Sequence, residues 1–131
     1  MTWNIELSPT RMNILVIDDN PCFLDIINII YTDAGHQVSC ISSTEQILQT
    51  LKSKEQVFDF ALIDLRLQNK SGIDVAKTLK ATFPSCFAKT NFIIVSHFNE
   101  DSAAAQSVIQ AGLIFKEKPA EIKNYLKLIT K

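Results

Sequence analysis

The apolar residues of the chain fall into short continuous runs, separated by longer segments with a helical period. Four of the runs are too brief for a helix and are rich in β-branched or aromatic residues, which is typical of strands buried on both faces of a sheet. These four runs are residues 14–17, 60–63, 92–95 and 113–115. A weaker fifth run, residues 37–41, lies between the first two. The pattern therefore predicts five strands.

Segments with helical signals follow these runs. The first begins with Asn20 as its N-cap and Pro21 at the first helical position, and Gly35 is expected to end it. The second begins at Ser43, which has the spacing of a capping box with Gln46. The remaining three predicted helices are residues 72–83, ended by Pro84, a segment capped by Asn99 and closed by Gly112, and residues 122–129.

Strands that alternate with helices through short links run parallel, and their crossovers are right-handed. We therefore expect an α/β fold in which helices cover both faces of one five-stranded parallel sheet. The common order is the doubly wound, flavodoxin-like 2-1-3-4-5 arrangement, which places the switch point and the expected site at the carboxyl ends of strands 1 and 3. Residues 12–131 are expected to form this domain. Residues 1–11 are interpreted as an N-terminal extension, with Trp3 as an incidental tail residue.

Size and charge narrow the function classes. With 131 residues, 47% hydrophobic and 21% charged, the chain has the composition of one folded domain. Its 13 basic and 14 acidic residues give a net charge of -1, which disfavours direct nucleic-acid binding. No apolar run approaches the roughly 18 residues of a membrane span, and the amino terminus lacks the pattern of a secretion signal. We expect a cytoplasmic protein with no membrane contact.

Acidic residues follow two of the predicted strands. Asp18 and Asp19 come directly after strand 1, and Asp64 follows strand 3. If these strands are neighbours, about 4.8 Å apart, the three carboxyl groups converge on the switch point. At 5 Å and an effective dielectric constant of 20, one pair of like charges costs about 3 kcal/mol, so the cluster requires raised pKa values or a cation. Oxygen ligands at a half-open site favour Mg²⁺.

Two further groups are expected at the same edge of the sheet. Ser96 ends strand 4, and Lys118 with Pro119 follows strand 5. Each is common by itself, because a lone serine at this place is usually a loop hydroxyl and a lone lysine a solvated surface charge. Ser96 and Lys118 indicate a functional site only because they are expected beside the acids.

The combination resembles the response-regulator receiver family of two-component signalling, over about residues 13–130. Gly72 and Phe115 also stand where that family has a glycine before its third helix and a switching aromatic residue. The motif residues that carry the resemblance are Asp18 and Asp19 after strand 1, Asp64 after strand 3, Ser96 after strand 4, and Lys118 with Pro119 after strand 5.

The resemblance implies a role for each residue. Asp64 would be the phosphoacceptor that takes a phosphoryl group from a sensor histidine kinase or a histidine phosphotransfer protein. Asp19, Asp64 and the backbone carbonyl of Arg66 would bind Mg²⁺ directly, and Asp18 would act mainly through a metal-bound water. The chain would then be a signalling phosphoacceptor in a phosphorelay rather than an enzyme, with self-phosphotransfer and autodephosphorylation as its only chemistry.

The resemblance also implies a switch. Lys118 and Ser96 would contact the phosphoryl group, and inward movement of Ser96 would let the ring of Phe115 rotate to a buried position. This would alter the surface of the fourth helix, fifth strand and fifth helix, which would bind a downstream protein target or a second copy in a homodimer. Phe115 has no hydroxyl to hold it outward, so a permanently buried core aromatic is the alternative. The family also implies a cis peptide between Lys118 and Pro119.

Some positions depart from the family pattern. The family more often has methionine and proline where Leu67 and Gln68 stand. His97, after Ser96, replaces what is usually a small residue; its imidazole would either shield the phosphoryl site from water or point to the solvent. Arg66 and His97 are thus the residues expected to modulate access.

Two other readings remain open. The first is a binding module with the receiver fold that is never phosphorylated, although such modules usually lack part of the motif set. The second is a phosphohydrolase of the haloacid-dehalogenase type, which also uses a strand-end aspartate and Mg²⁺. That family needs a second acid two residues after the nucleophile, and here Asn20 and Arg66 stand at those positions.

Overall fold

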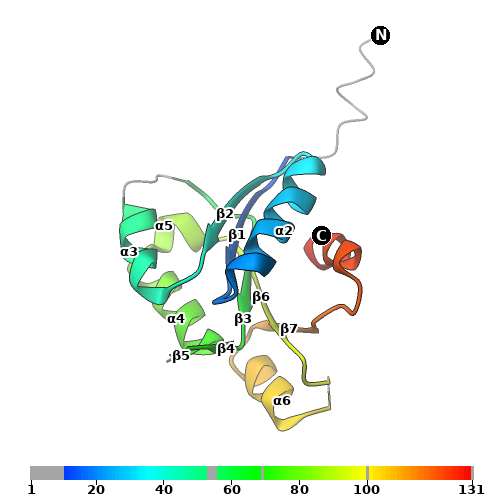
Figure 1. Cartoon of the computed structure of the whole chain (residues 1–131). Helices are drawn as coiled ribbons and strands as arrows, with labels where there is room; N and C mark the ends of the chain where they lie inside the picture. Colours follow the sequence, from blue (N-terminus) through cyan, green and yellow to red (C-terminus); the bar gives the residue numbers. More distant parts are fainter. Residues whose placement is uncertain (1–10, 53–55, 69, 100, 131) are drawn as a thin grey trace.

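A computed structural model describes residues 11–52, 56–68, 70–99 and 101–130. Its centre is a five-stranded parallel sheet in the order β2-β1-β3-β6-β7 (Figure 1), which confirms the predicted flavodoxin-like order. The strands are β1 (Asn13–Ile17), β2 (Gln37–Ile41), β3 (Phe60–Asp64), β6 (Asn91–Ser96) and β7 (Ile114–Glu117). The proposed extension, residues 1–11, and Trp3 lie outside the described residues except for Arg11.

Helices cover both faces of the sheet. One face carries α2 (Pro21–Asp33) and the 3-10 helix η1 (Ile122–Ile129), which contact each other. The other face carries α3 (Thr44–Lys52), α4 (Gly72–Thr82), the short α5 (Pro84–Phe87) and α6 (Ala103–Gln110) (Figure 1). No described helix combines the length and apolar character that crossing a bilayer would demand.

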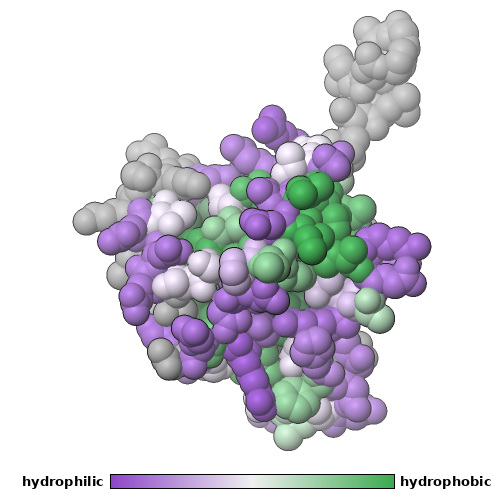
Figure 2. All heavy atoms as spheres, viewed as in Figure 1, coloured by the Kyte–Doolittle hydropathy of each residue, from purple (hydrophilic) through white to green (hydrophobic). Residues whose placement is uncertain are grey.

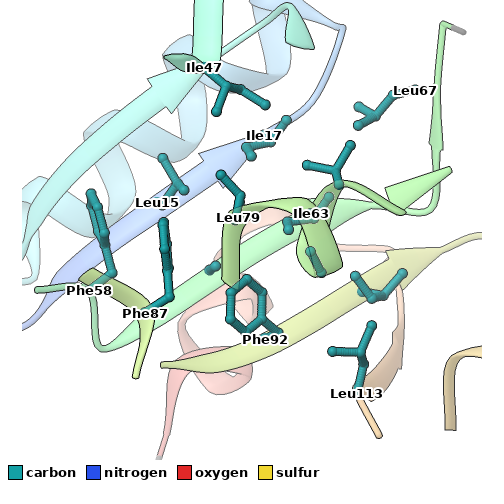
Figure 3. Close-up of a cluster of buried hydrophobic side chains, with 14 of the residues drawn as sticks. Leu15, Ile17, Ile47, Phe58, Ile63, Leu67, Leu79, Phe87, Phe92 and Leu113 are labelled. Atoms are coloured by element: carbon teal, nitrogen blue, oxygen red, sulfur yellow. The ribbon is translucent and has the colours of Figure 1, made fainter. Parts of the chain in front are cut away.

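The two faces bury two separate cores because successive strand side chains point to opposite sides. Leu15 and Ile17 of β1 join the larger core beneath α3 and α4, shown in Figure 3. Ile14 and Val16 belong to the smaller core beneath α2 and η1. Continuous apolar runs are therefore what a doubly covered sheet requires. Figure 2 also shows apolar side chains gathered on the face that carries α2.

Local capping explains where the first and fourth predicted helices begin. Asn20 is the N-cap of α2, and its side chain accepts hydrogen bonds from the N–H groups of Cys22 and Phe23, as predicted. The expected cap Asn99 is wrong for the fourth helix: Ser102 caps α6 and accepts from the N–H of Ala105. The side chain of Asn99 instead accepts from the N–H of Asp101 in the preceding turn.

The sequence pattern did not predict several short elements. After β3 the chain forms a small antiparallel pair, β4 (Arg66–Leu67) with β5 (Lys70–Ser71), and α5 follows α4. Elements of two to four residues are too short to show a period. The fifth helix is a 3-10 helix over Ile122–Ile129, in which Tyr125 and Ile129 are the buried side chains.

Candidate functional site

Strand pairing brings the three acids together at the carboxyl edge of the sheet. β1 and β3 are parallel neighbours with Ile17 opposite Ile63, so Asp18, which follows β1, and Asp64, the last residue of β3, lie at the same level. Asp18, Asp19 and Asp64 each offer a carboxylate oxygen, and these oxygens lie within 4.8 Å of one another. The structure thus places side by side the acids that are 46 positions apart in the chain.

Lys118, which directly follows β7, adds an ammonium group to the cluster. Its N–H donates to the carbonyl of Ser96 over 2.8 Å, which fixes the backbone just after β7. Its Nζ lies 3.3 Å from Oδ2 of Asp64 and 3.7 Å from Oδ2 of Asp18. If all four groups are ionised, three carboxylates and one ammonium leave a formal charge of −2. A cation of two charges would balance this cluster.

Asp18 is the most deeply buried acid of the cluster. Its side chain is almost fully buried, and burial raises its pKa, with further increases from the charges of Asp64 and Asp19. The N–H of Asn20, which donates to Oδ1 over 2.9 Å, and the ammonium of Lys118 oppose the shift. Because the folded state favours the protonated form, ionised Asp18 lowers stability as pH rises from its ordinary pKa through the raised one.

An open pocket of about 440 Å³ lies above the cluster. The residues that line it are Asp18, Asp19, Asn20, Phe23, Asp64, His97, Lys118, Pro119 and Tyr125. Ser96 is not among them: it is buried at the end of β6, and its Oγ accepts the N–H of Phe98 over 3.2 Å. The hydroxyl hydrogen of Ser96 is left for another acceptor, which an oxygen atom in the pocket would supply if Ser96 turned toward it.

The expected cis peptide between Lys118 and Pro119 is wrong. No peptide bond among the described residues is cis, so the bond between Lys118 and Pro119 is trans. The trans form of an X-Pro bond is favoured by about 0.5–1 kcal/mol. With this bond trans, the ammonium of Lys118 already reaches both Asp18 and Asp64, so contact with the acids does not demand the other isomer.

The remaining predicted site residues, Phe115, His97 and Arg66, differ in where they lie relative to the pocket. Phe115 is buried in the larger core, so the structure holds it inward, and its rotation stays a prediction. His97 is exposed and lines the pocket. The N–H of Arg66 donates to Oδ1 of Asp64 over 3.3 Å, whereas its guanidinium lies 4.8 Å from the ring centre of Phe98. Arg66 therefore links the loops after β3 and β6 rather than lining the pocket.

Sequence reasoning missed two aromatic residues of the pocket wall. Phe23, in the first turn of α2, and Tyr125, in η1, line the pocket, and their ring centres lie 5.2 Å apart. Tyr125 lies within the predicted last helix, residues 122–129, and no role at the site was predicted for it. One sequence signal could have found them. Phe23 comes shortly after Asp19 and Tyr125 shortly after Lys118, so both are expected near the same edge of the sheet.

Comparison with known proteins identifies the family. The family model of the response regulator receiver domain matches residues 14–129. The transcriptional regulatory protein ZraR of Escherichia coli K12 is 27% identical over 114 residues, which are 87% of this chain and 24% of that protein. The solved structure of the chemotaxis response regulator CheY4 of Vibrio cholerae has a TM-score of 0.75 at 18% identity, covering 92% of this chain and 97% of that one.

A second solved structure has a similar fold. It is a response regulator protein from Burkholderia pseudomallei with a phosphorylated aspartic acid, calcium ion and citrate, with a TM-score of 0.73 at 23% identity, covering 92% of this chain and 67% of that one.

The chain belongs to the response regulator receiver domain family, which confirms the resemblance seen in the sequence. It is a signalling domain of the two-component type, and this assignment favours the receiver over the phosphohydrolase alternative. The chain spans about a quarter of the length of ZraR, the curated relative described above. The cluster of Asp18, Asp19 and Asp64 could hold a metal ion.

Gly72 fixes the backbone beside Asp64. Its N–H donates to the carbonyl of Leu65 over 2.7 Å, and a Cβ built on it would overlap the carbonyl oxygen of Asp64. The obstacle is backbone, which cannot turn aside as the end of a flexible side chain can. The first residue of α4 must therefore be a glycine for the loop after β3 to keep this course.

We expect Gly72→Ala to lower the free energy of unfolding by about 1–3 kcal/mol, because the methyl group overpacks a close backbone contact. Thr78→Ala, on the exposed side of the same helix, is the matched control and should change stability by less than about 0.5 kcal/mol. Urea unfolding of both variants measures the difference. A Gly72→Ala variant as stable as wild type would show that the contact relaxes at no cost.

Proposed function

We propose that Asp64 accepts a phosphoryl group from the phosphohistidine of a sensor histidine kinase or a histidine phosphotransfer protein, with Mg²⁺ bound at the acidic cluster. The observation that carries this proposal is the contact of the Lys118 ammonium with Asp64, 3.3 Å, within a cluster of three carboxylates. Residues 12–131 would be the receiver domain, residues 1–11 an extension, and the cytoplasm the compartment.

The donor set fits Mg²⁺. Asp18, Asp19 and Asp64 offer carboxylate oxygens at an open pocket, and Mg²⁺ prefers oxygen ligands while keeping several waters. Asp19, Asp64 and the carbonyl of Arg66 would bind the ion directly, and Asp18 through water. When bound, the ion would offset negative charge on the phosphoryl oxygens. The Burkholderia pseudomallei response regulator of similar fold was solved with a phosphorylated aspartic acid and a calcium ion, which supports a phosphoacceptor aspartate and a cation in a protein of this kind.

Asp64, Lys118 and Ser96 have separate roles in the proposed phosphoryl transfer. A carboxylate oxygen of Asp64 attacks the phosphorus, the bond from phosphorus to the imidazole nitrogen breaks, and the imidazole leaves with the electron pair. The ammonium of Lys118 lies beside Oδ2 of Asp64, where negative charge accumulates on the phosphoryl oxygens. Ser96 would donate its hydroxyl hydrogen to the phosphoryl group, since its Oγ already accepts from Phe98.

The output surface would be that of α6, β7 and η1. Large apolar side chains are exposed on all three elements: Ile109, Ile114, Ile122 and Leu126. Exposed apolar side chains of this kind are typical of surfaces that bind proteins. A downstream protein target, or a second copy of the chain in a homodimer, would bind here when phosphorylation changes the positions of Ser96 and Phe115.

Phosphorylation of Asp64 is tested by mass. We expect wild type, incubated with Mg²⁺ and either acetyl phosphate or a panel of phosphorylated histidine kinases, to gain the mass of one phosphoryl group. Asp64→Asn should gain none because the nucleophile is gone. Asp33→Asn, an exposed acid at the far end of α2, is the control and should behave as wild type. A wild-type chain that takes up no phosphate from any donor would favour the binding module that is never phosphorylated.

The exposed imidazole of His97 stands at the pocket, and we propose that it, with Arg66, modulates access to the phosphoryl group. Loss of the ring should admit water, so phosphorylated His97→Ala is expected to lose its phosphate several times faster than wild type. Gln106→Ala, an exposed position on α6, controls for a general effect. The measurement is phosphate release after the donor is removed, and equal decay in wild type and His97→Ala would remove this role.

A further inference from the structure

Tyr125 is a pocket residue that neither the family motif nor the switch described above uses. It lies on η1, its side chain is buried, and it lines the pocket together with Asp18, Asp64 and Lys118. Burial raises the pKa of its hydroxyl to about 12, and the negative charges of Asp18 and Asp64 add to the shift. The phenol is therefore protonated at neutral pH and stands in the field of the acids.

The ring and backbone of Tyr125 are held in place. Its carbonyl accepts the hydroxyl hydrogen of Tyr31 over 2.8 Å, and Tyr31 is itself fully buried in α2. Its ring packs against Phe23 with centres 5.2 Å apart. These two contacts tie η1 to α2 and hold Tyr125 at the wall of the pocket.

The hydroxyl of Tyr125 is available for a ligand. Among the described residues none hydrogen-bonds to it, and no buried side-chain oxygen or nitrogen there lacks a partner. The hydroxyl oxygen is therefore not completely sealed from solvent, and this residue lines the pocket. At the wall of the pocket that also contains Asp64, the protonated phenol is a hydrogen-bond donor without an acceptor among the described residues.

The contrast with Phe115 gives this hydroxyl a role. Phe115, on β7, is buried and has no polar atom to report on the phosphoryl group. Tyr125 has one, and it belongs to the same η1 whose outer side exposes Ile122 and Leu126. A hydrogen bond at Tyr125 would thus connect the pocket directly to the proposed output surface.

We propose that the hydroxyl of Tyr125 donates a hydrogen bond to the phosphoryl group on Asp64 and thereby couples phosphorylation to the position and stability of η1. This inference rests on the proposed function, because the acceptor exists only after Asp64 is phosphorylated. Tyr125 acts here as a positioning residue rather than as a participant in the transfer.

The test measures amide hydrogen exchange of η1 with and without acetyl phosphate and Mg²⁺, while the intact mass reports the phosphorylated fraction. In wild type we expect phosphorylation to slow exchange in residues 122–129 by about tenfold, the effect of one hydrogen bond to a charged acceptor. Tyr125→Phe keeps the ring contact with Phe23 and should be phosphorylated to the same extent, but without the slower exchange. Its phosphoaspartate should also have a lifetime changed by a factor of about three or more.

Tyr31→Phe is the matched control, since Tyr31 and Tyr125 are the two tyrosines of the chain. It removes the contact to the Tyr125 carbonyl and leaves the Tyr125 hydroxyl, so it should keep the phosphorylation-dependent slowing. Equal slowing in wild type and Tyr125→Phe, at equal phosphorylation, would overturn the inference and leave the proposed function intact. A wild-type chain without added phosphate would overturn the proposed function, and the role of Tyr125 would fall with it.

Discussion

Three carboxylates held within 4.8 Å of one another, with the Lys118 ammonium against two of them, are the constraint on which the rest of the site depends. Burial of Asp18, with the repulsion from Asp64 and Asp19 added to it, raises the pKa of this carboxyl, so its ionised form is unfavourable for folding. The fold tolerates this because the acids lie at the ends of two adjacent strands whose apolar residues are buried. A doubly covered parallel sheet thus supplies the stability that a strained, functional edge requires.

The surroundings of the cluster hold it rigidly. The register of β1 against β3 sets the spacing of Asp18 and Asp64, and the hydrogen bond from Lys118 to the Ser96 carbonyl sets the direction from which the ammonium approaches. Gly72 sets the course of the chain just after Asp64. The loops after β3 and β6 are linked beside the pocket by the contact of the Arg66 guanidinium with Phe98, worth about 0.5–1 kcal/mol at an exposed site. A phosphoryl group on Asp64 would therefore act on an ordered set of neighbours.

The sequence was sufficient to predict the sheet and its acids because both depend on strong, repeated signals. Continuous apolar runs identify buried parallel strands, and residues that follow such strands must meet at one edge. Side-chain competition at single positions was not predictable in the same way: Ser102 rather than Asn99 caps α6, since both have suitable side chains. The trans bond before Pro119 and the β4–β5 pair depend on local geometry that no period reveals. Tyr125 was missed because a buried ring indicates a core position whereas a hydroxyl indicates a polar site, and the helical period reports only the burial.

The most direct measurement is the free energy of unfolding of wild type and Asp18→Asn from urea titrations at neutral pH, with and without Mg²⁺. Asparagine keeps the acceptor for the Asn20 N–H and removes the charge, so we expect Asp18→Asn to be more stable than wild type when no divalent cation is present. Mg²⁺ at about 100 times its dissociation constant should stabilise wild type by about 2.7 kcal/mol, and the variant by less. Wild type that gains nothing from Mg²⁺, together with a variant less stable than wild type without it, would contradict a shared cation site.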